Sequence, residues 1–334
     1  MLTNSWRQLR YITVKPTDFP AGIGHQFCNW LVPNILARRY NLKFVHQPFV
    51  GEIDGRNDTQ GSNGYQISNP VKLWNDFLNL GNGQLTLKDL PEELTEINIA
   101  HTEEGEVGWD HQNFKCLLET NFTHILYRTS ELGSGQFINI DWDFYKNNNL
   151  KTRYNDSKQV KSFKCYFDKD DTNIAITIRR GDVTKNQQLG RWISLDHYLH
   201  VMNTLADIKE LKHITFHIYA WDMPEEEKNT LLLHQLFGRR QIKLHIDEDV
   251  FSTFYHFTKA DIFVSGQGSF SLLANYLTDA VKLTTPWWGT FNNNQLMHWD
   301  NFPNDIEDII SINSTGTFDS QKILRALKVK NENS

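Results

Sequence analysis

The sequence predicts an α/β protein built from two domains. The clearest indication lies after residue 172, where short apolar segments of strand length alternate with segments of helical length. This alternation is typical of parallel sheets that are covered by helices on both faces. A length of 334 residues allows two domains of ordinary size, and 39% hydrophobic residues allow substantial cores. We therefore expect an N-terminal domain over 1–145, a linker region rich in Asn and Lys over 146–171, and a C-terminal domain over 172–334.

The first domain is expected to open with a short strand and a loop. Residues Tyr11–Val14 predict the strand, and the following KPTDFPAGIGHQ predicts the loop. A helix follows over Phe27–Tyr40, in which Pro33 is expected to introduce a kink or to confine regular helix to the residues after it. The remaining elements are a helix over Val71–Leu80 and strands over Leu42–Val45, Ile97–His101 and His124–Tyr127.

The second domain shows a cleaner alternation of apolar strands and helices. Strands are expected over Ile174–Ile178, Ile214–Ala220, Ile242–Ile246, Ile262–Val264 and Val281–Leu283. Helices are expected over Leu195–Ile208, Glu225–Phe237, Asp249–Thr258 and Phe270–Leu277. Ligands of such sheets bind outside the carboxyl ends of the strands, so the loops that follow these strands are candidate binding sites.

Net charge and composition limit the classes of partner and the cellular compartment that we expect. The formal net charge is −6 and no long basic block occurs, which argues against a nucleic-acid partner. No apolar run approaches the ~20 residues that a membrane span needs, and the N-terminus lacks the apolar core of a signal peptide. Three widely separated cysteines, Cys28, Cys116 and Cys165, favour a reducing compartment. We expect a cytoplasmic protein without a membrane span in this chain; peripheral membrane association stays open, as does the Golgi if the chain is a fragment of a longer enzyme.

Several tryptophans lie among polar and Gly-rich neighbours. They are Trp109, Trp142, Trp287 and Trp288. Aromatic faces beside amide side chains suit sugar rings, which carry both C–H faces and hydroxyl groups. The alternative is that these rings are ordinary core residues, as most large aromatic side chains are.

The segment ITIRRGD, Ile176–Asp182, places two arginines where a buried strand is expected to end. Planar guanidinium groups bind phosphate oxygens in pairs, so Arg179 and Arg180 suit a pyrophosphate. Gly181 would allow the backbone to turn sharply after them. The alternatives are a surface arginine pair bridged to nearby acids, or a chance Arg-Gly-Asp adhesion triplet.

This segment resembles the His-x-Arg-Arg-Gly-Asp motif of the α1,2-, α1,6- and protein O-fucosyltransferase superfamily, although Thr177 occupies the histidine position. The resemblance implies a GT-B-like fold, in which two Rossmann-like domains face a cleft. It also implies an inverting, metal-independent transfer of L-fucose from GDP-fucose, the donor substrate, to a hydroxyl of a glycan acceptor, with no cofactor. Arg179 would contact the donor β-phosphate, Arg180 would support it, and Asp182 would orient an arginine. Because Thr177 removes one contact to the nucleotide, another GDP-sugar donor stays open.

A second segment, Ala260–Leu277, is similar to the family's late strand, Ser-rich loop and helix. Gly266, Gly268, Ser269 and Ser271 form a small-residue turn that, with Phe270, opens a helix. Backbone N–H groups and hydroxyls there can receive phosphate oxygens with help from the helix dipole. The alternative is an ordinary helix N-cap by Ser269. The family's acid before this region is replaced by Thr253, and Asp249 is the candidate to serve instead.

A third segment, Gly22–Gln26, resembles the family's N-terminal Gly-x-Gly-Asn-Gln loop. Gly24 matches the second glycine, and His25 replaces the asparagine. We consider His25 a candidate general base for the acceptor hydroxyl, a hydrogen-bond donor to the β-phosphate, or only a loop residue.

Two other functions remain open at this point. The first is a metal-dependent glycosyltransferase with an Asp-x-Asp site at Asp247–Asp249 or Asp141–Asp143, because two carboxylates one residue apart can hold a divalent ion beside a diphosphate. The second is a glycan-binding protein without activity on the same scaffold, suggested by Thr177 and Thr253.

Overall fold

The computed structural model describes residues 9–15, 21–50, 67–99, 124–129, 142–186, 191–211, 213–238, 240–285, 307–313 and 315–332. Contacts divide the chain into two compact units, and the last division point lies between Ser157 and Lys158. The first unit comprises the described residues of 9–50 and 69–157, and the second comprises 67–68 and the described residues from Lys158 onward.

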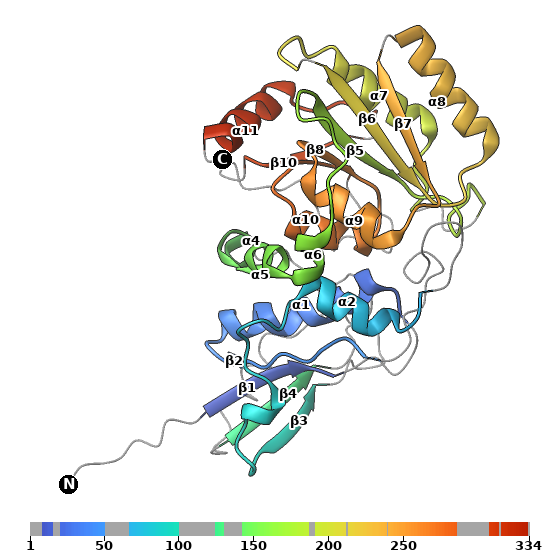
Figure 1. The fold of residues 1–334 in the computed structure, drawn as a ribbon. Coiled ribbons are helices and arrows are strands. Elements are labelled where there is room, and N and C mark those ends of the chain that lie inside the picture. Colours follow the sequence, from blue (N-terminus) through green and yellow to red (C-terminus); the bar gives the residue numbers. More distant parts are fainter. Residues whose placement is uncertain are drawn as a thin grey trace. The chain divides into compact units, whose positions relative to one another are not determined.

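The first unit contains a parallel sheet with strand order β2-β1-β4-β3. Its elements are β1 (Leu9–Val14), α1 (Ile23–Arg39), β2 (Lys43–Phe44), α2 (Pro70–Leu78), the 3-10 helix η3 (Leu87–Asp89), β3 (Thr95–Ile99), β4 (His124–Thr129), α4 (Trp142–Asn147) and α5 (Leu150–Asp156). Figure 1 shows α1 packed along this sheet. The predicted strands are confirmed, with ends that differ by a few residues.

Helix α1 begins earlier than the sequence predicts and runs through Pro33. Its first residue is Ile23, so the Gly22–Gln26 segment is the start of a helix and the loop prediction for it is wrong. A proline within a helix costs about 3 kcal/mol. Burial of side chains on both sides of Pro33, among them Trp30, Leu31 and Ile35, offsets that cost.

The second unit contains a larger parallel sheet with strand order β10-β9-β8-β5-β6-β7. Its elements are α6 (Lys158–Ser162), β5 (Thr172–Ile178), α7 (Leu195–Ala206), β6 (Ile214–Ala220), α8 (Glu225–Gly238), β7 (Gln241–Ile246), α9 (Val250–Lys259), β8 (Ile262–Ser265), α10 (Ser269–Leu277), β9 (Val281–Thr284), β10 (Ile309–Ser311) and α11 (Ser320–Glu332). Helices cover both faces of this sheet (Figure 1). The two parallel sheets confirm the predicted α/β class.

The core of the second unit explains the strand pattern. Ile174, Ile176 and Ile178 alternate along β5 and pack in one cluster with residues of α7 and α11. On the other face, the ring of Phe257 from α9 contacts Tyr219 and stacks on Phe263. Because both faces of the sheet are covered, strands such as β8 (IFVS) carry apolar residues on both faces, which helps the sequence to predict them.

Two elements after Leu283 have no counterpart in the sequence analysis. Strand β10 has three residues and gains its regular structure by pairing with β9. Helix α11 is largely polar, and only a narrow stripe that includes Ile323 and Ala326 is buried against the core. Both elements depend on partners far away in the chain.

The Asn- and Lys-rich region over 146–171 contains α5 and α6 together with the end of α4. Leu150, Tyr154 and Val160 are buried there. These helices are short and contain few apolar residues at helical spacing, so sequence periodicity does not reveal them.

Buried histidines form a hydrogen-bonded cluster on the α9 side of the second sheet. Nδ1 of His217 lies 3.0 Å from Nε2 of His245, and Nδ1 of His245 lies 2.8 Å from Oε1 of Glu248. His256 accepts from the Tyr166 backbone N–H at 3.2 Å through Nε2, while its Nδ1 donates to the Ser252 carbonyl at 2.7 Å. The ring of His256 is therefore neutral, with its hydrogen on Nδ1.

We expect the protein to lose stability as the pH falls from about 6.5 to about 4. Burial lowers the pKa of His256 to about 4, and burial followed by the neighbouring His245 lowers the pKa of His217 to about 3, from an ordinary value of 6.5. The unfolded chain binds more protons in this window, so the free energy of unfolding decreases as the pH drops, by about 3 kcal/mol for a group such as His256. Urea unfolding at pH 7, 6, 5 and 4 measures the slope. His256→Gln should flatten it, whereas the exposed-site control His200→Gln should not; equal slopes for both variants would contradict the assignment.

Candidate functional site

The predicted arginine motif lies at the carboxyl end of the central strand β5. The strand ends at Ile178, and Arg179 and Arg180 follow it directly. Gly181 has φ +76°, a left-handed conformation that suits glycine, so the predicted sharp turn is confirmed. The turn brings Asp182 back toward the strand end, where its Oδ2 accepts from Arg179 Nη2 at 2.6 Å.

The side chain of Arg179 lies against the start of α10. A Cβ placed on Gly268 would be 2.8 Å from Arg179 Nη1, so the guanidinium occupies the space that a side chain at 268 would need. Nε of Arg179 is buried and has no hydrogen-bond partner among the described residues. The two motifs that the sequence resemblance selected, about ninety residues apart, therefore meet in one place.

A second glycine holds the same turn close to β5. A Cβ on Gly266 would lie 2.8 Å from the backbone oxygen of Thr177. The backbone of Thr177, the residue at the motif's histidine position, is therefore packed against the β8–α10 turn.

Helix α10 starts without a side-chain cap. Its N-cap is Gly268, which has no side chain to cap the helix, and Ser269 is the first helical residue. The alternative role of Ser269 as N-cap is therefore wrong. The first N–H groups of any helix point out of its end rather than to a carbonyl of the same helix, and they carry the positive end of the helix dipole.

The other residues of this turn are more enclosed. Ser271 is buried, and the ring of Phe270 packs edge-to-face on Phe254 with a centroid distance of 5.4 Å. The Phe270 ring therefore packs on α9.

Arg180 points away from this turn and into the protein. It is 3% exposed, its Nε donates to Glu227 Oε2 at 2.7 Å, and its Nη1 donates to the Arg179 carbonyl at 2.8 Å. The ring of Trp192 lies 5.4 Å from its guanidinium carbon. Arg180 therefore holds the backbone of Arg179 in position.

Sequence reasoning missed a third arginine near this site. Burial lowers the pKa of Arg191, the nearby Arg179 cation lowers it further, and Asp182 opposes them. Arg191 therefore lies within electrostatic reach of the Arg179–Asp182 pair. In the sequence, Arg191 is marked only by its place in the loop RRGDVTKNQQLGRW, which also contains Arg179 and Asp182.

The acidic residues after β7 serve separate structural contacts. Asp249 is the N-cap of α9 and accepts from the Ser252 N–H at 2.8 Å. Asp247 accepts from the Asp222 N–H at 2.8 Å, and Glu248 pairs with His245. In the part of the chain that the structure describes, no group of three or more His, Cys, Asp or Glu side chains could hold a metal ion.

The remaining candidates lie in the first unit or outside the described residues. Gly24 and His25 belong to the first turn of α1, where the N-cap Gly22 likewise provides no side-chain cap. Trp109, Trp287, Trp288, Asp141 and Cys116 lie outside the described residues, and the side chain of Trp142 is not described. Among the described helices, none is long and apolar enough to cross a membrane.

Comparisons with known proteins give structural neighbours but no sequence relatives. No protein-family model matches the chain, and no curated protein matches its sequence. A mutant of Arabidopsis thaliana FUT1 solved with GDP aligns with a TM-score of 0.43 at 10% identity, over 86% of this chain and 72% of that chain. POFUT1 in complex with GDP aligns with a TM-score of 0.45 at 10% identity, over 82% of this chain and 98% of that chain. POFUT1 in complex with GDP-fucose gives a TM-score of 0.41 at 9% identity, over 82% and 95% of the two chains. Likeness at this level does not identify a function, so the proposal below rests on the residues of this chain.

Proposed function

We propose that this chain is a glycosyltransferase that transfers L-fucose from GDP-fucose to a hydroxyl of a glycan, and that its second unit binds the donor diphosphate. The observation that carries the proposal is the position of Arg179 on Gly268, at the uncapped start of α10. Guanidinium and helix N–H groups converging on one point form a favourable site for a phosphate. The resemblance of both segments to the fucosyltransferase motifs supplies the identity of the donor.

The chemical difficulty in this transfer is the departure of GDP while positive charge develops on the sugar ring. Arg179 and the N–H groups of Ser269, Phe270 and Ser271 stabilise the negative charge that grows on the β-phosphate oxygens, more strongly in the transition state than in the bound donor. Asp182 orients Arg179 through Nη2, which leaves Nη1 directed at the turn. Arg180, which is paired with Glu227, holds the backbone of Arg179 by donating to its carbonyl.

The acceptor hydroxyl loses its proton as the sugar transfers, and inversion requires its attack from the face opposite to GDP. We assign His25, in the first turn of α1, as the candidate base. The donor mechanism as proposed requires no metal ion, because cationic side chains and helix N–H groups neutralise the leaving diphosphate.

Thermal unfolding with GDP, GDP-fucose, UDP and CMP, each with and without EDTA, tests the donor class. A ligand at about 100 times its dissociation constant stabilises a fold by about 2.7 kcal/mol, which a melting curve resolves. We expect stabilisation by GDP and GDP-fucose that EDTA does not change. Stabilisation by UDP that EDTA removes would favour the metal-dependent alternative, and no response to any nucleotide would favour the glycan-binding alternative.

The role of His25 predicts a specific change in the pH profile of transfer. If His25 removes the acceptor proton, His25→Ala should lower kcat by about 10²–10⁴ and abolish the acidic limb of the profile, because general bases contribute rate factors of that size. The rate of transfer at saturating GDP-fucose from pH 5 to 9 measures both effects. An acidic limb that is unchanged in His25→Ala would remove His25 from this role while leaving the donor site intact.

A further inference from the structure

A segment without helix or strand, 163–167, follows α6 and precedes β5. The Tyr166 ring stacks on the ring of His256 in α9, with a centroid distance of 3.5 Å and an angle of 24° between the planes. The Phe167 ring lies 4.3 Å from the ring of His217 in β6. We call 163–167 the strap, because its aromatic side chains attach it to α9 and β6.

The first histidine under the strap, His256, is held in its neutral form by two hydrogen bonds. Its Nδ1 donates to the Ser252 carbonyl at 2.7 Å, and its Nε2 accepts from the Tyr166 backbone N–H at 3.2 Å. A second proton on this ring would have to bind at Nε2, where it would face the N–H of Tyr166. The strap can therefore keep this bond only while His256 is neutral.

The second histidine under the strap, His217, is held neutral in the same way. Asn173 Nδ2 donates to the carbonyls of Asp168 and Asp171 at 2.6 and 3.0 Å, so the amide oxygen is the atom that faces His217 Nε2 at 3.2 Å. His217 Nε2 therefore carries the hydrogen, and its Nδ1 accepts from His245 Nε2 at 3.0 Å. A proton on Nδ1 would break that bond.

Charged groups on the neighbouring elements act on both rings. His245 in β7 pairs with Glu248 Oε1 at 2.8 Å and repels a positive charge on either ring, whereas Glu248 favours a charge on His256. Lys243, also in β7, repels a charge on His217. The other titratable groups nearby are Cys165 and Tyr166 of the strap, Tyr219 of β6, and Tyr255 and Lys259 of α9. Burial raises the pKa of this thiol and of the three phenols, so they stay uncharged while the histidines titrate.

The strap is the least firmly held part of this face of the second unit. Tyr166 is 41% exposed, and Cys165 beside it is exposed as well. By contrast, α9 is held by apolar packing, because Phe257 is 1% exposed and stacks on Phe263 of β8. Neither phenylalanine titrates, so acid does not weaken that contact directly. Local opening is therefore expected at the strap first.

We propose that falling pH releases the strap from α9 and β6 while the rest of the second unit stays folded, because the two histidines under it take up protons once it leaves. In the attached state, burial lowers the pKa of His256 from 6.5 to about 4. Between pH 8 and pH 5, the ratio of released to attached strap should therefore increase about thirtyfold from His256 alone, and His217 adds to this. Release lengthens the free connection between α6 and β5 and does not depend on the proposed transfer reaction.

Hydrogen exchange of the Tyr166 amide measures this ratio, because the N–H must leave His256 before it exchanges. Exchange is recorded at single-residue resolution at pH 8, 7, 6 and 5 and is divided by the intrinsic rate at each pH. We expect the protection of Tyr166 to fall at least about thirtyfold from pH 8 to pH 5. At every pH it should be at least about tenfold below that of Phe257, and low urea should accelerate exchange only at Phe257, because local opening exposes little surface.

The wild-type measurements decide the question even if a variant does not fold. Protection of Tyr166 that does not change with pH would overturn the proposal. Equal protection and equal urea sensitivity at Tyr166 and Phe257 would also overturn it, because both amides would then exchange only through unfolding of the whole unit.

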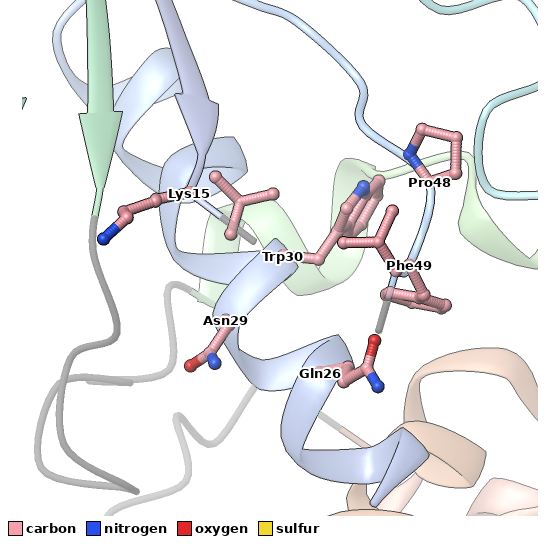
Figure 2. A pocket seen from close by; sticks show the side chains of 8 residues that line it. Lys15, Gln26, Asn29, Trp30, Pro48 and Phe49 are labelled. Carbon is pink, nitrogen blue, oxygen red and sulfur yellow. The ribbon is translucent and has the colours of Figure 1, made fainter. Parts of the chain in front are cut away.

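His256→Gln tests the assignment to this ring, because glutamine can accept from the Tyr166 N–H but takes up no proton in this pH range. The fall in Tyr166 protection should shrink by about thirtyfold in this variant. His46→Gln is the matched control in the first unit, because His46 Nδ1 likewise accepts, from Trp30 Nε1 at 3.0 Å. Figure 2 shows this Trp30 on α1, where it lines a small pocket of the first unit. An undiminished fall in His256→Gln, or the same reduction in His46→Gln, would contradict the proposal.

Discussion

Arg179→Ala should reduce fucosyl transfer by at least 10²–10³ while the protein remains folded. Removal of one donor to a developing oxyanion typically costs ~2.7–4 kcal/mol of barrier, and in the proposed site the lost group is a cation at the diphosphate. The side chain is 29% exposed and its ion pair with Asp182 is near the surface, so its loss should change stability little. Initial rates with GDP-fucose and the GDP-induced shift in melting temperature measure the two consequences, and both should be lost together.

The matched control for this variant is Arg325→Ala. Arg325 is 58% exposed and lies on α11, with longer ion pairs to Glu307 and Asp319. It should retain full turnover and a normal GDP response. Near-normal transfer by Arg179→Ala would exclude Arg179 as the phosphate ligand and with it the donor site as proposed.

Gly268→Ala should weaken GDP binding at least tenfold with little loss of stability. The backbone at 268 has φ 175°, an extended conformation that alanine adopts without strain. Its Cβ, however, would lie 2.8 Å from Arg179 Nη1, so the flexible end of that arginine must move out of the proposed phosphate site. We expect at least a tenfold weaker response to GDP in calorimetry, because a guanidinium displaced by about 1 Å no longer fits the ligand.

Gly266→Ala provides the contrast, because its Cβ would meet backbone rather than a side-chain end. The obstacle is the Thr177 oxygen at 2.8 Å, which cannot move without shifting β5 or the turn. We expect this variant to lose about 1–3 kcal/mol of stability, the usual cost of overpacking. If Gly268→Ala lost stability instead of GDP affinity, the close approach of Arg179 would be only a packing contact.

The sequence was most informative where secondary structure and burial coincide. The strand Ile214–Ala220 is buried along nearly its whole length, and the apolar residues on both of its faces mark it with correct ends. The sequence also predicts the turn after the arginine pair, because the left-handed conformation at Gly181 favours glycine. Helix α1 was misread because a proline and two glycines suggest a loop, while burial of its apolar face makes it a helix from Ile23 onward.

The chemistry of the candidate site was present in the sequence, but its assembly was not. Residue types at the strand ends made Arg179, Arg180 and the small-residue turn chemically suitable, and their resemblance to the fucosyltransferase motifs selected them as the candidates. Only the tertiary structure decided that Arg179 faces the start of α10 while Arg180 turns inward to Glu227, and that Arg191 joins them. The chemistry of two neighbouring arginines is the same, so residue type alone does not distinguish them. Because β5 pairs with β8, the turn after β8 lies beside the end of β5, where Arg179 contacts it and Arg180 does not.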